Sequence, residues 1–153
     1  MSGNKEKVIA GLQAIVTGLS QQATGHAIQS RIFASQGLSK LAEKYAEHVE
    51  EEQKYVNLCI DRLLDLGADV KNEAKRETPV HKDIVEWIRY DLQISKDGLA
   101  WLAGLVEAAR DDYTTFDILK EYYQDEETDM YEAEGLLALA ECIGKENWYA
   151  RQL

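Results

Sequence analysis

Acidic residues and a histidine recur near the middle of four helical patterns, at positions that each pattern places toward the inside. Glu52 and Tyr55 lie three residues apart on the second pattern, and Glu126 and Asp129 have the same spacing on the fourth. Residues three apart share one face of a helix. Burying an unpartnered neutral polar group costs about 2–7 kcal/mol. Such residues at one height on four helices therefore indicate a shared polar site, the layout of a metal–carboxylate centre.

The altered ligand pattern is the main feature of this site. A dinuclear iron centre in a helical bundle takes one glutamate from each of two helices and a Glu-x-x-His pair from each of the other two. Glu52 and Glu126 occupy the glutamate positions of the two pairs, whereas Tyr55 and Asp129 stand where histidines are expected. Ser95 replaces the glutamate of the third helix, and the first helix offers Leu19, Gln22 and His26 near its expected ligand.

Four long helices must position these residues. Apolar residues at three- and four-residue spacing predict helices over about residues 4–35, 38–66, 81–109 and 115–143, and residues 145–153 are expected to form a short terminal helix. Gly37, Gly67 and Gly144 follow the predicted helix ends. The polar stretch 68–79 is the one long connection, and it lets the third helix run parallel to the second. The pattern predicts an all-α four-helix bundle with one long crossover between the second and third helices.

Length and composition restrict the class of protein. A chain of 153 residues fits a single domain, here residues 1–153. A net charge of −11 repels phosphate groups, so nucleic-acid binding is not expected. Cys59 and Cys142 form no CxxC pair and are interpreted as reduced residues of a cytoplasmic protein. The amphipathic N-terminal segment does not look like a signal peptide, and no segment is apolar enough to predict a membrane span.

Several segments together carry a resemblance to a known family. They are Arg31-Ile32-Phe33 with Gly37-Leu38, residues 48–66, Asp91-Leu92 with Asp97-Gly98, residues 112–115, and residues 124–127. Over nearly its whole length the chain resembles the bacterioferritin and Dps-like branch of the ferritin superfamily. The tail 143–153 resembles the short fifth helix of bacterioferritins. The resemblance implies a ferritin-like bundle with a short C-terminal helix.

The resemblance also suggests a role for each candidate metal residue. Glu52 and Glu126 match family ligands, and Asp129 is a shorter oxygen ligand at a histidine position. Tyr55 would hydrogen-bond a carboxylate or ligate weakly. His26 falls where bacterioferritins have a tyrosine beside the site, so it could supply a replacement nitrogen. Iron is therefore the expected metal, held as a single ion or as a weak pair.

Haem and subunit number follow from the same comparison. The position of the haem-ligating methionine holds Gln53, so no haem is expected. The acidic pair of the Dps dimer interface reads Asn57 and Asp61, which is a poor match. The resemblance implies a homo-oligomer, with a 24-subunit shell expected and a 12-subunit shell as the alternative. A homologous partner subunit that completes the site is left open.

The sequence leaves three functions open. The first is a ferritin-like cage subunit that binds, stores or sequesters iron at an altered centre and is at most a weak ferroxidase. The second is a non-catalytic structural or partner subunit whose polar centre is held by hydrogen bonds without metal. The third is a ferritin-like oxygenase or hydroxylase that uses another metal, although no substrate pocket is marked in the sequence.

Overall fold

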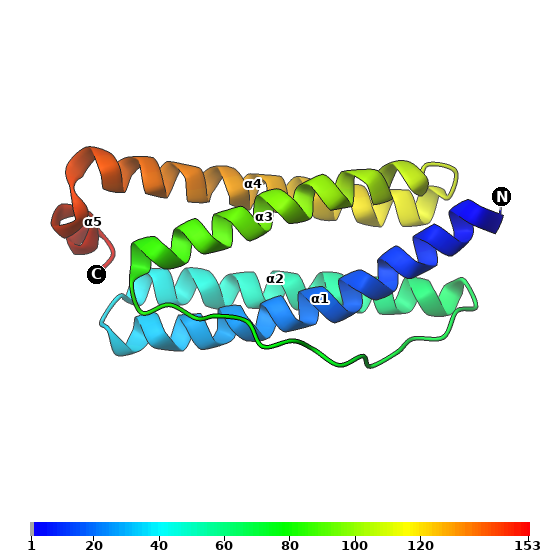
Figure 1. Ribbon diagram of the computed structural model, residues 1–153, viewed down its shortest axis with the longest axis horizontal. Helices are drawn as coiled ribbons and strands as arrows, with labels where there is room; N and C mark the ends of the chain where they lie inside the picture. The colour runs from blue at the N-terminus through cyan, green and yellow to red at the C-terminus, as the bar shows by residue number, and fades with distance from the viewer. Residues whose placement is uncertain (1) are drawn as a thin grey trace.

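The bundle consists of four long helices and one short one. The computed structural model describes residues 2–153, with side chains described from residue 4. The helices are α1 (Ser2–Ser35), α2 (Ser39–Asp65), α3 (Ile84–Ala108), α4 (Tyr113–Ile143) and α5 (Lys145–Arg151). Helices α1 and α2 form one antiparallel pair and α3 and α4 the other, and α5 folds across one end (Figure 1). The described residues form no strand, so the predicted all-α bundle with a short C-terminal helix is confirmed.

The helix boundaries agree with the predicted ones to within three residues, and aspartate caps explain two differences. Asp83 accepts a hydrogen bond from the backbone N–H of Glu86 (2.9 Å), so α3 begins at Ile84 rather than at residue 81. Asp112 accepts one from the N–H of Thr115 (3.2 Å), so α4 begins before the expected residue 115. Each cap satisfies an N–H group that has no partner inside the helix.

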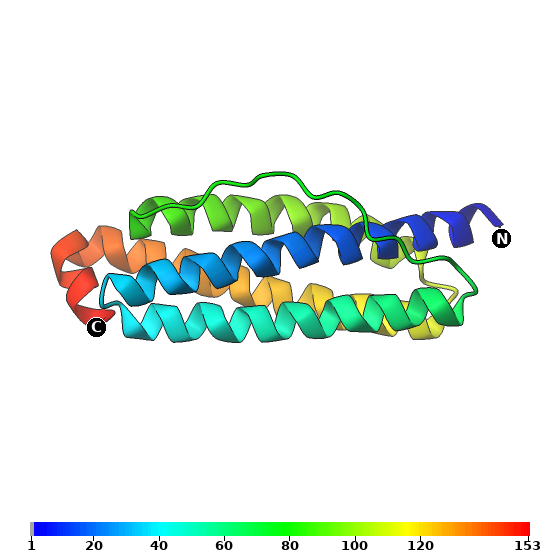
Figure 2. The same cartoon turned by 90° about the horizontal axis from the view of Figure 1, so that it is seen from below.

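The long crossover runs along α1 for much of the length of the bundle (Figure 2). The amide of Gln13 donates to the carbonyl oxygen of Lys71 (3.0 Å) and accepts from its N–H group (2.9 Å). Gln29 makes the same pair of bonds with the backbone of His81, at 2.6 and 3.2 Å. Two α1 glutamines thus hold this irregular segment against α1.

The apolar core is divided into two clusters. One contains Leu12, Tyr55 and Leu119 with their neighbours, and the other contains Phe33 and Trp87 with theirs. On every long helix the polar stretch singled out above lies between the two clusters. Of the described helices, none has both the length and the apolar composition that crossing a membrane would require.

Candidate metal centre

A buried histidine joins three helices at the middle of the bundle. His26 of α1 is only 5% exposed. Its Nδ1 lies 2.7 Å from Oε1 of Glu52 on α2, and its Nε2 lies 2.8 Å from Oδ1 of Asp91 on α3. A neutral imidazole has one donor nitrogen, whereas the imidazolium has two. Two carboxylate partners therefore favour the charged ring.

The surroundings of His26 maintain this charge. Burial alone would lower the pKa of His26, but the hydrogen bonds and negative charges of Asp91 and Glu52 outweigh it and raise the pKa to about 10. The hydroxyl of Tyr45 donates to the second oxygen of Asp91 (3.3 Å). The indole of Trp87 packs edge-on against the imidazole, with 5.9 Å between ring centroids. The result is an internal ion pair network with His26 as its cation.

This arrangement bears on the role predicted for His26. Both ring nitrogens are engaged, so a metal could reach one only if a carboxylate released the ring and the ring lost a proton. Supply of a nitrogen ligand by His26 stays a prediction. Asp91 was recognised from the sequence as an inward-facing residue, but it was not assigned as a partner of His26.

The side chain of Tyr55 contacts α4. Its ring is buried and packs against Tyr122, with centroids 4.9 Å apart. Its hydroxyl donates to Oδ2 of Asp125 on α4. Of the two roles predicted for Tyr55, the geometry matches the hydrogen bond to a carboxylate.

Four of the five predicted ligands, all except Tyr55, line one small cavity. Glu52, Glu126 and Asp129 surround a space of about 30 Å³ beside His26. A space of this size holds a water molecule or one ion. Oε2 of Glu52 is buried and has no hydrogen-bond partner among the described residues. Buried polar atoms are nearly always partnered, so this carboxylate oxygen is a candidate for binding a cation or a water.

The carboxylates around the cavity repel one another. Burial, together with the charges of Glu52 and Asp129, raises the pKa of Glu126 to about 8. Burial, together with the charge of Glu51, raises the pKa of Asp129 to about 7. Loss of solvation and like charges both disfavour the ionised form. Protons or a cation would relieve this repulsion.

A second group of ligand atoms lies between α2 and α4 at the same height. His48, Glu51 and Asp129 each place one nitrogen or oxygen atom within 4.8 Å of the others. Nδ1 of His48 is 3.6 Å from Oδ2 of Asp129. Burial and the positive charge of His26 lower the pKa of His48 to about 4, which leaves its imidazole neutral. A neutral imidazole and two carboxylates form a donor set suited to iron, manganese or zinc.

Sequence reasoning predicted Asp129 but not its two neighbours. His48 was expected to be an inner-surface or interface residue, and Glu51 was passed over for the adjacent Glu52. The available signal was the His-x-x-Glu spacing on α2, which places His48 and Glu51 on one face. Only the position of α4 brings Asp129 to that face.

Comparison with known proteins agrees with this architecture. The sequence model of the family described as "Ferritin-like domain" matches residues 9–143. The chain belongs to this family. It is 32% identical over the full length of both chains to a protein named bacterial ferritin from Neisseria meningitidis serogroup B. Bacterial ferritins from Pseudomonas aeruginosa and Synechocystis are 30% and 29% identical, over 100% and 97% of the chain. The predicted membership of the ferritin superfamily is confirmed.

Proposed function

We propose that this chain is an iron-binding subunit of a ferritin-like shell in which a single-ion site takes the place of a dinuclear centre. The relatives named bacterial ferritin support the iron-storage part of this proposal. Iron is here the cargo, held by protein side chains. The shell is a cytoplasmic homo-oligomer, with 24 subunits expected and 12 as the alternative.

The observation that carries the proposal is the donor set of His48, Glu51 and Asp129. The His26 bridge explains why one ion is enough. In a dinuclear centre, metal cations balance the carboxylates of the bundle interior. Here the imidazolium of His26 supplies positive charge between Glu52 and Asp91, each within 2.8 Å of a ring nitrogen. The protein thereby neutralises part of the acidic centre itself, and a second metal ion is no longer needed for that purpose.

The remaining ligand atoms then favour one ion between α2 and α4. We assign the imidazole of His48 and the carboxylates of Glu51 and Asp129 as the ligands for Fe(II). One Fe(II) ion gives up one electron on oxidation to Fe(III), whereas a pair can deliver two electrons to O₂ together. A single-ion site therefore fits slow oxidation, so the chain is at most a weak ferroxidase.

Anaerobic Fe(II) titration tests the assignment. Wild-type protein should bind one ion per subunit at the high-affinity step, and Glu51→Ala should weaken that step by at least about tenfold. Glu50→Ala is the matched control, because Glu50 is the adjacent carboxylate and is exposed. Equal binding by Glu51→Ala and Glu50→Ala would remove Glu51 from the site.

The second candidate function is a metal-free structural subunit of the same fold. The same His26 bridge favours it, because a bundle whose buried carboxylates already have a cation can fold without metal. The two functions differ in their response to iron, since a ligand that binds only the folded state raises its stability. An unchanged melting temperature at saturating anaerobic Fe(II), together with a titration that shows no binding, would favour the structural subunit.

A further inference from the structure

A groove lies between α1 and α3, and it shares Gln22, Ser95 and Glu126 with the small cavity beside His26. It has a volume of about 390 Å³ and is lined by Ala14, Ile15, Gly18, Leu19, Gln22, Ile94, Ser95, Gly98, Leu99, Trp101, Leu102, Tyr122 and Glu126. We call it the α1–α3 groove. Its size is within the range of small-molecule sites. Two glycines border open space in it, since a Cβ atom added at Gly18 or Gly98 would meet no atom within 4 Å.

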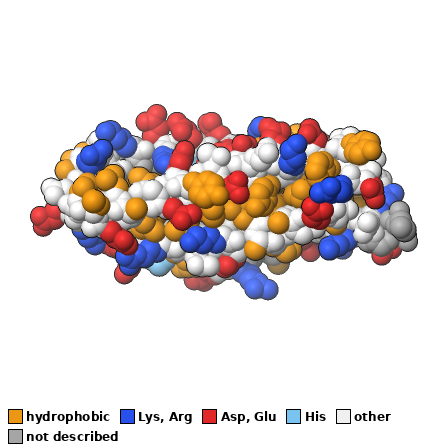
Figure 3. All heavy atoms as spheres, turned by 90° about the horizontal axis from the view of Figure 1, so that it is seen from above, with side chains coloured by type: hydrophobic (Ala, Val, Ile, Leu, Met, Phe, Trp, Pro, Cys, Tyr) orange, Lys and Arg blue, Asp and Glu red, His pale blue; other side chains and the backbone are white. Residues whose placement is uncertain are grey.

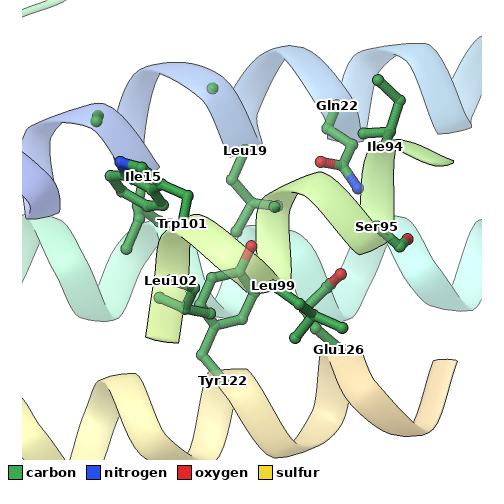
Figure 4. A pocket seen from close by; sticks show the side chains of 13 residues that line it. Ile15, Leu19, Gln22, Ile94, Ser95, Leu99, Trp101, Leu102, Tyr122 and Glu126 are labelled. Carbon is green, nitrogen blue, oxygen red and sulfur yellow. The ribbon is translucent and has the colours of Figure 1, made fainter. Parts of the chain in front are cut away.

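The α1–α3 groove is amphipathic along its length. Ile15, Trp101 and Leu102 form an apolar end, and Gln22 and Ser95 lie toward the other end with Glu126 on the floor (Figure 4). The hydroxyl of Tyr122 also faces this space. None of these four polar side chains makes a hydrogen bond with another described residue. The groove thus offers several hydrogen-bonding groups beside a large apolar wall.

Exposed apolar side chains flank the same opening. Ile94 is 39% and Trp101 49% exposed, and both line the groove from α3. In the space-filling view, apolar side chains run along the side formed by α3 and α4, between charged ones (Figure 3). Exposed apolar surface beside a concave space is typical of a binding site.

The charges of the lining residues restrict the ligand. Among the described residues, no lysine or arginine lines the groove, so an anionic head group would have no counter-charge there. The net charge of −11 adds repulsion for any anion. Glu126 is the one carboxyl group among the described lining residues, and it can exchange hydrogen bonds with a ligand hydroxyl.

We propose that the α1–α3 groove binds a small uncharged organic molecule that is largely apolar and carries one hydroxyl group. The apolar part would lie against Ile15, Trp101 and Leu102. The hydroxyl would exchange hydrogen bonds with Gln22, Ser95 or Glu126. The proposal goes beyond iron binding, because the groove is lined by residues of α1, α3 and α4 that do not include the assigned iron ligands His48, Glu51 and Asp129.

Calorimetric titration of metal-free protein with 4-ethylphenol tests this site. Trp101 is a built-in reporter, since Trp87 and Trp148 are 3% and 0% exposed. We expect saturable binding with one site per subunit and a change in the fluorescence of Trp101. Absence of saturable binding would overturn the proposal. Tighter binding of 4-ethylbenzoate or 4-ethylbenzylamine would overturn the claim that the ligand is uncharged.

Matched glycine variants locate the binding. Gly98→Leu and Gly18→Leu should each fill the groove and weaken 4-ethylphenol binding by at least about tenfold. Gly135→Leu is the control, because Gly135 is an exposed α4 residue outside the groove with equal room for a Cβ atom.

Melting temperature and mass in solution verify the fold of each variant. Unchanged binding by both groove variants would place the ligand elsewhere. Loss of assembly in both, with Gly135→Leu intact, would identify the groove as a subunit contact.

Discussion

At the scale of single residues, one histidine changes the chemistry of the bundle centre. His26 is held by carboxylates of two other helices, so its charge is part of the folded structure. A buried charge with its partners removed is far more costly than a buried pair. His26 therefore contributes to stability chiefly through what its loss would leave behind, namely Glu52 and Asp91 without a cation.

Replacing His26 should accordingly destabilise the bundle. We expect His26→Ala to lower the free energy of unfolding by about 3–5 kcal/mol, measured by urea denaturation without metal. His48→Ala serves as the control, since His48 is only partly buried and its nearest carboxylate atom, Oδ2 of Asp129, is 3.6 Å away. The control should lose less than half as much. Equal losses for the two variants would contradict the view that His26 is a charged bridge.

The charge of His26 should also make stability depend on pH. Its pKa is raised from an ordinary value of 6.5 to about 10 in the folded state. The folded protein then holds the proton more tightly, so this contribution is complete below pH 6.5 and is lost as the pH rises toward about 10. Urea denaturation between pH 6 and 10 measures it. His26→Leu should reduce this dependence, and the raised pKa values of Glu126 and Asp129 account for the part that remains. An identical slope in wild type and variant would contradict the contribution of His26.

At the scale of helices, the spacing between α1 and α3 varies along their length. At Gly11 the backbone of α1 approaches the side chain of Leu105 so closely that an added Cβ atom would overlap it. Seven residues further on, Gly18 borders the open α1–α3 groove. The two glycines look alike in the sequence, and only the position of α3 distinguishes them.

Alanine substitutions should separate these glycines. We expect Gly11→Ala to destabilise the protein by about 1–3 kcal/mol, because the buried Leu105 has little room to move. Gly18→Ala should stabilise it by about 0.5–1 kcal/mol, because alanine favours the helix and meets no neighbour. Thermal or urea unfolding measures both. Stabilisation by Gly11→Ala would show that α1 and α3 are not in close contact there.

At the scale of the whole molecule, the exposed apolar residues point to assembly. Ile28 on α1, Leu64 on α2 and Tyr113 on α4 are 47%, 59% and 83% exposed. The family comparison supports an oligomer in general terms, and the resemblance to bacterioferritins implies a dimer contact through the first two helices. Subunit number stays a prediction.

A charge on α1 should weaken that contact. We expect Ile28→Lys to lower the mass in solution below that of the wild-type assembly, measured by sedimentation. Tyr131→Lys is the control, because Tyr131 is an exposed residue of α4 and lies outside the first two helices. A lower mass for the control alone would move the contact to α4.

The sequence by itself determined the helices, their order, the long crossover and which residues face inward. These features depend on local periodicity and caps, which a chain carries wherever its helices later pack. The tertiary structure decided the partners. His26 meets Glu52 and Asp91, Tyr55 turns to Asp125, and His48 meets Asp129, because the rotation and height of each helix come from packing between helices far apart in the sequence.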